Sequence, residues 1–309
     1  MREIGCPICS KNEKTLVFQS TLPEGFDETS PPSPYSAHYQ INKCPLCGLF
    51  RSSPIMDDAG VSALYKNSSE TNVQPGEEGN VARTMRQYYR LAVPHLFQKQ
   101  RVLDVGCDMG FFLEAAKLDG FAEVHGIEPN PQARRIAEKI DGAILSSHFF
   151  EATAYPPDHF DLITLIHVLD HLVDPRIVLK HALVNLQSGG LLVAVVHNVD
   201  SLLFRLLGEK FPIFNLYHHY FFSKNTLALL FRAQGYEVIK VVSTSNCYSL
   251  GFFAKRVPII PKSFREVAFR FLERTGLASI PINIPVGNIG IVARKPLRAN
   301  TFDDVVVNQ

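Results

Sequence analysis

The chain has 309 residues, of which 46% are hydrophobic and 20% charged, and its formal net charge is +1. This length and composition are typical of a globular protein with one large domain and a small one. A net charge so close to zero gives no global attraction to nucleic acid or to an anionic membrane. The N-terminus has no apolar run of signal-peptide length, and no apolar stretch reaches the length of about 18 residues that a spanning helix needs, so we expect a cytoplasmic protein without a transmembrane segment.

Four of the six cysteines occur in two copies of the pattern C-P-x-C, Cys6-Pro-Ile-Cys9 and Cys44-Pro-Leu-Cys47. Each pair can hold a metal ion from one tight turn, and two pairs supply the four soft ligands of a tetrahedral zinc site. A redox-active pair is the alternative. Two matching pairs favour zinc in a structural role, because four cysteines leave no open position for a catalytic water. We therefore predict a small zinc module over residues 1–55, followed by a linker and N-terminal helices over 56–100.

A strand, a glycine loop and a helix follow. The strand begins near residue 100, the loop runs from Gly106 to Gly110, and the helix continues to residue 118. A second strand ends at Glu128. In nucleotide-binding α/β folds, an acid at this place accepts hydrogen bonds from ribose hydroxyls, and the loop lets the ligand approach backbone amides and a helix N-terminus. The loop and the acid together predict a cofactor site, although Asp108 stands where a second glycine is usual.

Strands and helices alternate along the rest of the chain. Strands are expected at 160–166, 191–196 and 236–242, and helices at 176–186 and 224–234. The alternation predicts a mostly parallel sheet with helices on both faces. Ligands of such sheets bind at the C-terminal ends of the strands. The residues placed at or near such ends are Asp104, Gly106, Glu128, His167 and His197.

Six stretches of the chain resemble the motifs of the class I S-adenosylmethionine-dependent methyltransferases. They read VLDVGCDMGFFLEAAK, VHGIEPNPQARRIAEK, FDLITLIHVLDHLVDP, LQSGGLLVAVVHNVDSL, HHYFFSKNTLALLFRAQGYEV and GNIGIVARK. With the two C-P-x-C pairs in front, the array is similar to a subgroup that carries an N-terminal zinc ribbon with four cysteine ligands. The resemblance implies an α/β fold with a Rossmann-like seven-stranded sheet over residues 101–295, its last strand antiparallel. A helical insert is then expected at about 249–285 and a loose tail at 296–309.

The resemblance implies ten residues that bind S-adenosylmethionine. They are Asp104, Gly106, Cys107, Asp108, Gly110, Glu128, Pro129, Phe149, Phe150 and His167. Aspartate tolerates unusual backbone angles in turns, and its carboxylate could face the cofactor's ammonium group. We therefore interpret the loop as functional; a decayed site is the alternative. Phe149 stands where many members carry an acid that reaches the adenine, which predicts recognition by backbone groups and by stacking on Phe149 or Phe150.

A histidine is the expected base if the methyl acceptor is a hydroxyl or a carbon acid. Four histidines compete for this role: His167, His197, His218 and His219. We favour His219, which matches a recurrent histidine of the family's segment before the last strand pair, or His167, which ends the fourth strand near the cofactor's sulfur. Any of the others could simply satisfy a buried carbonyl.

The predicted function is methyl transfer from S-adenosylmethionine to a carbon or oxygen of a small-molecule acceptor, in a protein with a structural Zn²⁺. An RNA methyltransferase and a non-catalytic cofactor-binding or zinc-dependent interaction protein are the alternatives. The near-neutral charge, without a stripe of Lys and Arg, counts against nucleic acid. The insert could be a lid over the substrate, a peripheral membrane contact, a dimer patch or a helix packed on its own domain. The acceptor's identity and the oligomeric state stay open.

Overall fold

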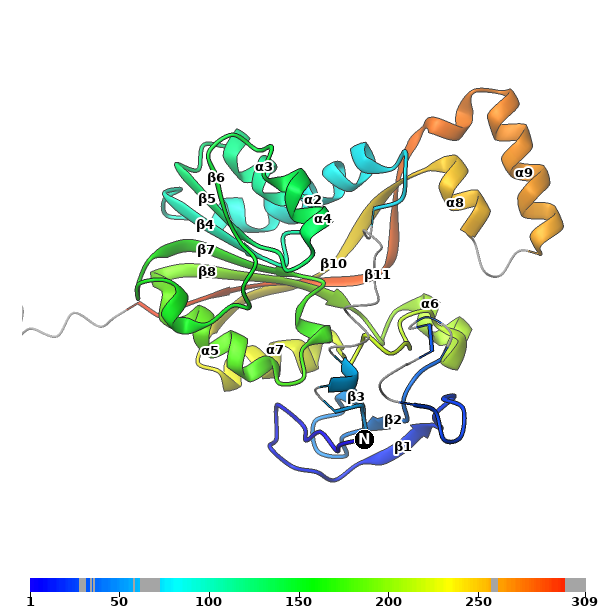
Figure 1. Ribbon diagram of the computed structural model, residues 1–309, viewed down its shortest axis with the longest axis horizontal. Helices are drawn as coiled ribbons and strands as arrows, with labels where there is room; N and C mark the ends of the chain where they lie inside the picture. The colour runs from blue at the N-terminus through cyan, green and yellow to red at the C-terminus, as the bar shows by residue number, and fades with distance from the viewer. Residues whose placement is uncertain are drawn as a thin grey trace, which may run out of the picture.

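The computed structural model describes residues 1–27, 32–33, 35, 37–57, 59–61, 73–256 and 261–297, with the side chain at position 262 excepted. Most of the predicted tail, residues 298–309, lies outside this part of the chain. A seven-stranded sheet forms the centre of the molecule, with helices on both sides (Figure 1). A smaller four-stranded sheet lies against one side, and a pair of helices extends from the other end of the fold.

The strands are β1 Thr15–Phe18, β2 Ile41–Lys43, β3 Phe50–Ser52, β4 Arg101–Val105, β5 Glu123–Ile127, β6 Ala143–Ser146, β7 Phe160–Ile166, β8 Leu186–His197, β9 Tyr220–Phe221, β10 Glu237–Ser249 and β11 Pro281–Arg294. The helices are α2 Glu78–Ala92, α3 Phe111–Leu118, α4 Pro131–Ala137, α5 Pro175–Asn185, α6 Leu202–Leu207, α7 Lys224–Ala233, α8 Leu250–Arg256 and α9 Lys262–Arg274. Short 3₁₀ turns are η1 Val93–His95, η2 Ala152–Ala154, η3 Leu169–His171, η4 Gly208–Lys210 and η5 Leu277–Ser279.

The large sheet has the strand order β10-β11-β8-β7-β4-β5-β6. The strands from β8 to β6 run parallel, whereas β11 is antiparallel to both β8 and β10. The predicted seven-stranded sheet with an antiparallel last strand is confirmed. β10 and β11 are longer than predicted, because they continue to pair with each other as far as Ser249 and Pro281.

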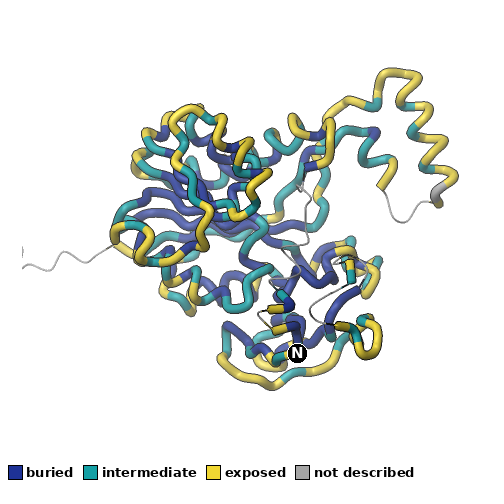
Figure 2. Tube along the Cα trace, in the orientation of Figure 1, coloured by how far each residue is buried: buried dark blue, intermediate teal, exposed yellow. Residues whose placement is uncertain are grey.

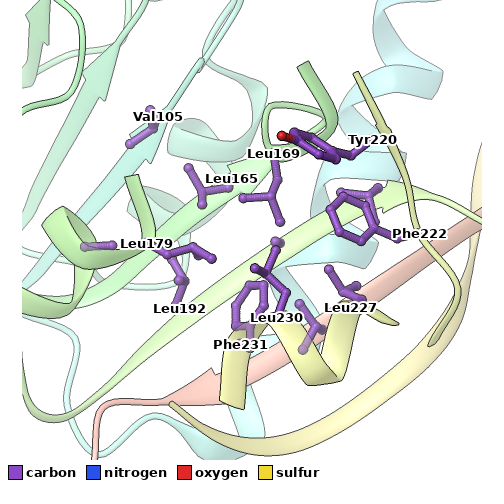
Figure 3. Packing of buried hydrophobic residues seen from close by; sticks show 14 of the residues in the cluster. Val105, Leu165, Leu169, Leu179, Leu192, Tyr220, Phe222, Leu227, Leu230 and Phe231 are labelled. Atoms are coloured by element: carbon purple, nitrogen blue, oxygen red, sulfur yellow. The ribbon is translucent and has the colours of Figure 1, made fainter. Parts of the chain in front are cut away.

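The central strand β7 is buried along its whole length. Its side chains alternate between two cores: Ile163 and Leu165 belong to the core beneath α5 and α7, and Leu162 and Ile166 to the core beneath α2 and α3. Figure 3 shows Leu165 of β7 and Leu230 of α7 among the side chains of the first core. Figure 2 shows buried residues concentrated along the central strands, with exposed residues on the outer surfaces. Because β7 is covered on both faces, its sequence is apolar except for Asp161 and Thr164.

Polar caps mark where three of the helices on the large sheet begin, α4, α5 and α7. The side chain of Asn130 accepts hydrogen bonds from the first amides of α4, and Asp174 does the same for α5, each followed by a proline in the first turn. Ser223 and Thr226 form a reciprocal capping box at the start of α7. Such caps satisfy backbone donors that have no partner within the helix.

The small sheet has the order β1-β2-β3-β9, so its last strand comes from the second half of the chain. We call residues 1–55 the cysteine module. Its buried Arg51 donates to the carbonyls of Ile4 at 3.1 Å, Asn12 at 3.0 Å and Glu13 at 3.2 Å, which ties the N-terminal segment to β3. Apolar residues of the module share one continuous core with α5 and α7. The module therefore packs directly on the large domain.

The region between β10 and β11 forms an arm of α8, α9 and η5 that extends away from the sheet (Figure 1). Exposed apolar side chains follow one another at helical spacing along α9: Phe264, Val267 and Phe271. No helix within the described ranges combines the length and the apolar character needed to cross a membrane.

Candidate functional site

The loop after β4 is closed against β5. The amides of Gly106 and Cys107 both donate to the carbonyl of Ile127, at 2.8 and 3.0 Å. Gly106 has a φ of 75°, and a Cβ at this position would lie 2.6 Å from Cγ2 of Val168. Gly110 has a φ of 81° and a Cβ there would lie 2.5 Å from Cδ1 of Ile140. Both positions therefore require glycine, for backbone conformation and for space.

Asp108 adopts a left-handed backbone conformation, with a φ of 47°. Aspartate is one of the few residues with a side chain that enters this region readily, so the loop keeps its shape without a glycine here. The amide of Asp108 donates to Oε2 of Glu128 at 2.9 Å, and the amide of Asn130 donates to Oε1 at 2.7 Å. Glu128 thus links the loop after β4 to the start of α4.

Three carboxyl groups come together at this loop: Asp104, Asp108 and Glu128. Burial raises the pKa of Asp104 to about 7, and the charges of Glu128 and Asp108 add to the effect, while a hydrogen bond from Thr164 opposes it. That hydroxyl lies 2.6 Å from Oδ1 of Asp104. Burial and the charge of Glu128 also raise the pKa of Asp108, to about 6. A cationic ligand would relieve the repulsion among the three groups, whereas a pyrophosphate would increase it.

The two predicted stacking residues lie in different surroundings. Phe149 is 81% exposed, beyond the end of β6, whereas Phe150 is buried in the core beneath α5, with its ring 6.1 Å from that of His181. Cys107 is also buried, and desolvation raises the pKa of its thiol. Pro129 is exposed at the end of β5. Of the two phenylalanines, only Phe149 has an accessible ring.

Polar side chains gather where β7 and β8 end. His167 directly follows β7 and has a φ of 54°, and its ring centre is 4.9 Å from that of His197, the last residue of β8. Nδ1 of His197 lies 2.8 Å from Oδ2 of the buried Asp170 in η3. Although burial by itself would raise it, the hydrogen bond and charge of His197 hold the pKa of Asp170 well below its usual range. Burial and the neighbouring His197 lower the pKa of His167 to about 3.

His218 belongs to the same group. Its ring centre lies 4.8 Å from that of His197 and 4.5 Å from that of His171, and its Nδ1 is 2.7 Å from the carbonyl of Ile213. Burial lowers the pKa of His218 to about 4. Ligand atoms of Asp170, His171 and His218 lie within 4.8 Å of one another, as do those of His167, Asp170 and His197.

The ring of His219 is not among the rings that meet at the ends of β7 and β8. It is buried beside Tyr39 of the cysteine module, with the ring centres 6.3 Å apart. The backbone of His219 bridges two elements: its amide donates to the carbonyl of Asp170 at 2.8 Å, and its carbonyl accepts from the amide of Ser52 at 2.9 Å. The sequence motif that favoured His219 does not reveal which of two adjacent histidines faces the strand ends. Asp170 was not among the predicted site residues, and its only signal was its place one turn after β7.

The four cysteines of the module lie together as free thiols, with their Sγ atoms within 4.8 Å of one another. Sγ of Cys6 and Sγ of Cys47 are 3.5 Å apart. Zinc–sulfur bonds of about 2.3 Å in a tetrahedron place the sulfurs roughly 3.8 Å from one another. The amide of Gly48, at a φ of 80°, donates to the carbonyl of Cys44 at 2.9 Å and closes one turn. The donor set and its spacing fit a zinc ion.

The chain is similar to known proteins over its large domain. A family model described as "Methyltransferase domain" matches residues 78–241. The chain is 29% identical over 169 residues to a ubiquinone biosynthesis O-methyltransferase of Nitrosospira multiformis, covering 48% of this chain and 70% of that protein. It is 28% identical over 170 residues to the protein of the same name from Aromatoleum aromaticum, covering 49% and 72%. A chain in the solved complex of the Haloferax volcanii Trm112 methyltransferase activator with a methyltransferase shares the fold, with a TM-score of 0.53 and 17% identity over 72% of this chain and 93% of that one.

Proposed function

This chain belongs to the class I S-adenosylmethionine-dependent methyltransferases, and we propose that it transfers the methyl group to a hydroxyl oxygen of a small-molecule acceptor. Oxygen is favoured over carbon because the similar curated proteins are named O-methyltransferases. The acceptor class we propose is a small hydroxylated metabolite, and RNA is disfavoured by a net charge of +1.

The three carboxyl groups at the loop after β4 carry this proposal. S-adenosylmethionine supplies an electrophilic methyl group on a sulfonium and has a second cation, its ammonium group. Asp104 and Asp108 would bind the cationic end, and Glu128 would accept hydrogen bonds from the ribose. Burial and mutual repulsion raise the pKa values of Asp104 and Asp108, and a bound cation offsets that penalty. The group therefore fits this cofactor better than an anionic dinucleotide.

The acceptor side is assigned to the ends of β7 and β8. We call the loop after β4 with its three carboxyl groups, Asp104, Asp108 and Glu128, the cofactor cradle. Val168 contacts this loop at Gly106, so the neighbouring His167 lies beside the cofactor cradle. Methyl transfer needs the acceptor oxygen in line with the methyl carbon and the sulfur, and the hydroxyl proton has to leave. We propose that His167 and His197 face this hydroxyl. His219 acts through its backbone, which joins η3 to β3.

We further propose that Cys6, Cys9, Cys44 and Cys47 hold a structural Zn²⁺. The ion would fix the turns that precede β1 and follow β2. Through β3 the module pairs with β9, and the hydroxyl of Ser52 donates to the carbonyl of His218 at 2.9 Å. The zinc module would therefore position the segment that brings His218 to the strand ends.

Calorimetric titration with S-adenosylmethionine tests the cofactor assignment. Glu128→Ala should weaken binding by about 10- to 100-fold, because hydrogen bonds to a charged group contribute about 1.5–3 kcal/mol. Glu138→Ala is the matched control: this glutamate directly follows α4, is exposed and lies 3.6 Å from Arg134, and its loss should leave binding unchanged. Equal affinity in the Glu128 variant would refute the placement of the ribose.

Incubation with methyl-labelled cofactor and a panel of phenols, catechols and metabolite extracts tests the reaction itself. The labelled product should be a methyl ether of a small molecule, identified by mass spectrometry and by the chemical shift of the new methyl group. Label found on carbon or in RNA would contradict the proposed acceptor atom or the proposed acceptor class. Cofactor binding without transfer to any acceptor would favour a non-catalytic role.

A further inference from the structure

His167, Asp170 and His197 form a compact group beside the cofactor cradle. They come from three places in the fold: the residue that follows β7, the turn η3 and the last residue of β8. Each offers a ligand atom, and the three atoms lie within 4.8 Å of one another. Ligands of one metal ion at bond lengths of about 2.0–2.2 Å lie roughly 3–3.5 Å apart. Small side-chain adjustments would therefore suffice for coordination.

Two polar atoms of the group are buried and have no hydrogen-bond partner among the described residues: Nδ1 of His167 and Oδ1 of Asp170. Asp170 is 1% exposed, so its free oxygen cannot turn to bulk solvent. A buried polar atom without a partner destabilises the fold, and more so when the group is charged. His167 also holds a left-handed backbone conformation, with a φ of 54°, which is strained for a residue with a side chain. Two unsatisfied polar atoms and local strain at one point indicate a site built for a ligand.

The chemistry of the donors identifies the ligand. Two imidazoles and one carboxylate are ligands that Mn²⁺, Fe²⁺ and Zn²⁺ accept, whereas Ca²⁺ and Mg²⁺ prefer oxygen ligands alone. We propose that His167, Asp170 and His197 bind a divalent transition-metal ion at the acceptor end of the site. With three protein ligands, such an ion keeps open positions for water or for an acceptor oxygen.

A second group, Asp170 with His171 and His218, shares the carboxylate. The first group is the better site because it contains both unpartnered buried atoms, whereas Nδ1 of His218 is already 2.7 Å from the carbonyl of Ile213. The first group also adjoins Val168, which contacts the cofactor loop at Gly106. The ion would thus lie between the cofactor cradle and the acceptor, with His218 packed behind His197.

The catalytic role of the ion rests on the proposed function. The bound cation would favour the ionised form of the acceptor hydroxyl, whose proton passes to solvent. The oxygen lone pair then forms the new O–C bond as the C–S bond breaks, and that bonding pair returns to sulfur. The products are the methyl ether and S-adenosylhomocysteine, so neither an oxidant nor a reductant is needed.

Titration with Mn²⁺ in the absence of acceptor tests the site independently of the reaction. Mn²⁺ favours nitrogen and oxygen ligands, so it does not compete for four thiolates that hold zinc. The wild type should bind one Mn²⁺ per chain, measured by calorimetry and by electron paramagnetic resonance, with zinc counted separately by mass spectrometry. His167→Gln and Asp170→Asn should each weaken Mn²⁺ binding at least tenfold, since even residues that only orient a ligand change affinity by about 10–100-fold.

His148→Gln, at an exposed histidine, is the matched control and should bind Mn²⁺ like the wild type. An unchanged circular dichroism spectrum shows that a variant is folded. No specific Mn²⁺ binding by the wild type overturns the proposal. So does loss of binding in His218→Gln with retention in His167→Gln, because the ion would then lie in the second group. Mn²⁺ binding with the expected pattern, together with methyl transfer that is insensitive to removal of the ion, confirms the site and overturns its catalytic role.

Discussion

Asp104→Asn should stabilise the unliganded protein, and increasingly so as the pH rises. In the folded chain burial raises the pKa of Asp104 from an ordinary value of 3.8 to about 7. Between these two values the folded state holds a proton that the unfolded state has lost. The contribution of this group to stability is therefore most favourable at low pH and falls as the pH rises towards 7. Above pH 7 the folded state carries the full penalty of a buried carboxylate near two others.

The size of the effect follows from the shift. Between pH 5 and pH 7 the contribution of Asp104 to the unfolding free energy falls over about 2 pH units, which corresponds to roughly 3 kcal/mol. For a chain of this length that corresponds to a gain of about 5 °C in melting temperature. Asparagine cannot ionise, and its amide oxygen can still accept the hydroxyl of Thr164, which lies 2.6 Å from Oδ1 in the wild type. Between pH 5 and pH 8 the melting temperature of the variant should therefore rise relative to that of the wild type by about 5 °C.

Melting curves of both proteins at pH 5 and pH 8, followed by circular dichroism, measure this difference. Asp141→Asn, at a fully exposed carboxylate, controls for the loss of a surface charge. S-adenosylmethionine should raise the melting temperature of the wild type at pH 8 more than that of Asp104→Asn, because the ligand's positive charge offsets a repulsion that the variant lacks. A variant that melts lower than the wild type by the same amount at both pH values would refute the raised pKa of Asp104.

Three further changes probe the loop, the adenine end and the module. Gly106→Ala should weaken cofactor binding and destabilise the fold, because its Cβ would meet Val168. Gly120→Ala is the control for backbone strain alone, since this glycine also has a positive φ but no described atom lies within 4 Å of the added carbon. Equal losses of melting temperature in the two variants would contradict a steric clash with Val168. Phe149→Ala should weaken S-adenosylmethionine binding by about 1–3 kcal/mol without loss of stability. Replacing the buried Phe150 by Ala should instead cost about 3–5 kcal/mol of folding free energy. Unchanged cofactor binding in Phe149→Ala would place the adenine elsewhere. Cys44→Ser should release zinc and lower the rate of methyl transfer while S-adenosylmethionine affinity is retained, measured by metal analysis, steady-state kinetics and calorimetry; full activity without zinc would argue against a positioning role for the module.

Much of the fold could be predicted because its signals are local. The run from Phe160 to Ile166 is apolar throughout most of its length, as a strand covered on both faces has to be, and the caps Asn130 and Asp174 mark where α4 and α5 begin. Caps are visible in the sequence because they act within three residues. Gly106 and Glu128 follow β4 and β5 directly, and parallel strands bring their carboxyl ends to one edge.

Only the tertiary structure decided which polar residues meet. His197 and Asp170 are separated by 27 positions and touch at 2.8 Å, because β7 and β8 are neighbours in the sheet. His218 and His219 are adjacent, yet one ring lies against His197 and the other beside Tyr39. No local pattern records this difference, because it depends on β9 pairing with β3 of the cysteine module.

The sequence by itself indicated a mostly parallel sheet, the glycine loop after β4, the acid after β5 and the two cysteine pairs, because each follows from residue type and short-range spacing. The tertiary structure decided that Phe150 belongs to the core, that three carboxyl groups share the cradle, and that His167, Asp170 and His197 form one group. These features depend on contacts between residues far apart in the chain. Burial and charge act through space, so their consequences are fixed only once the chain has folded.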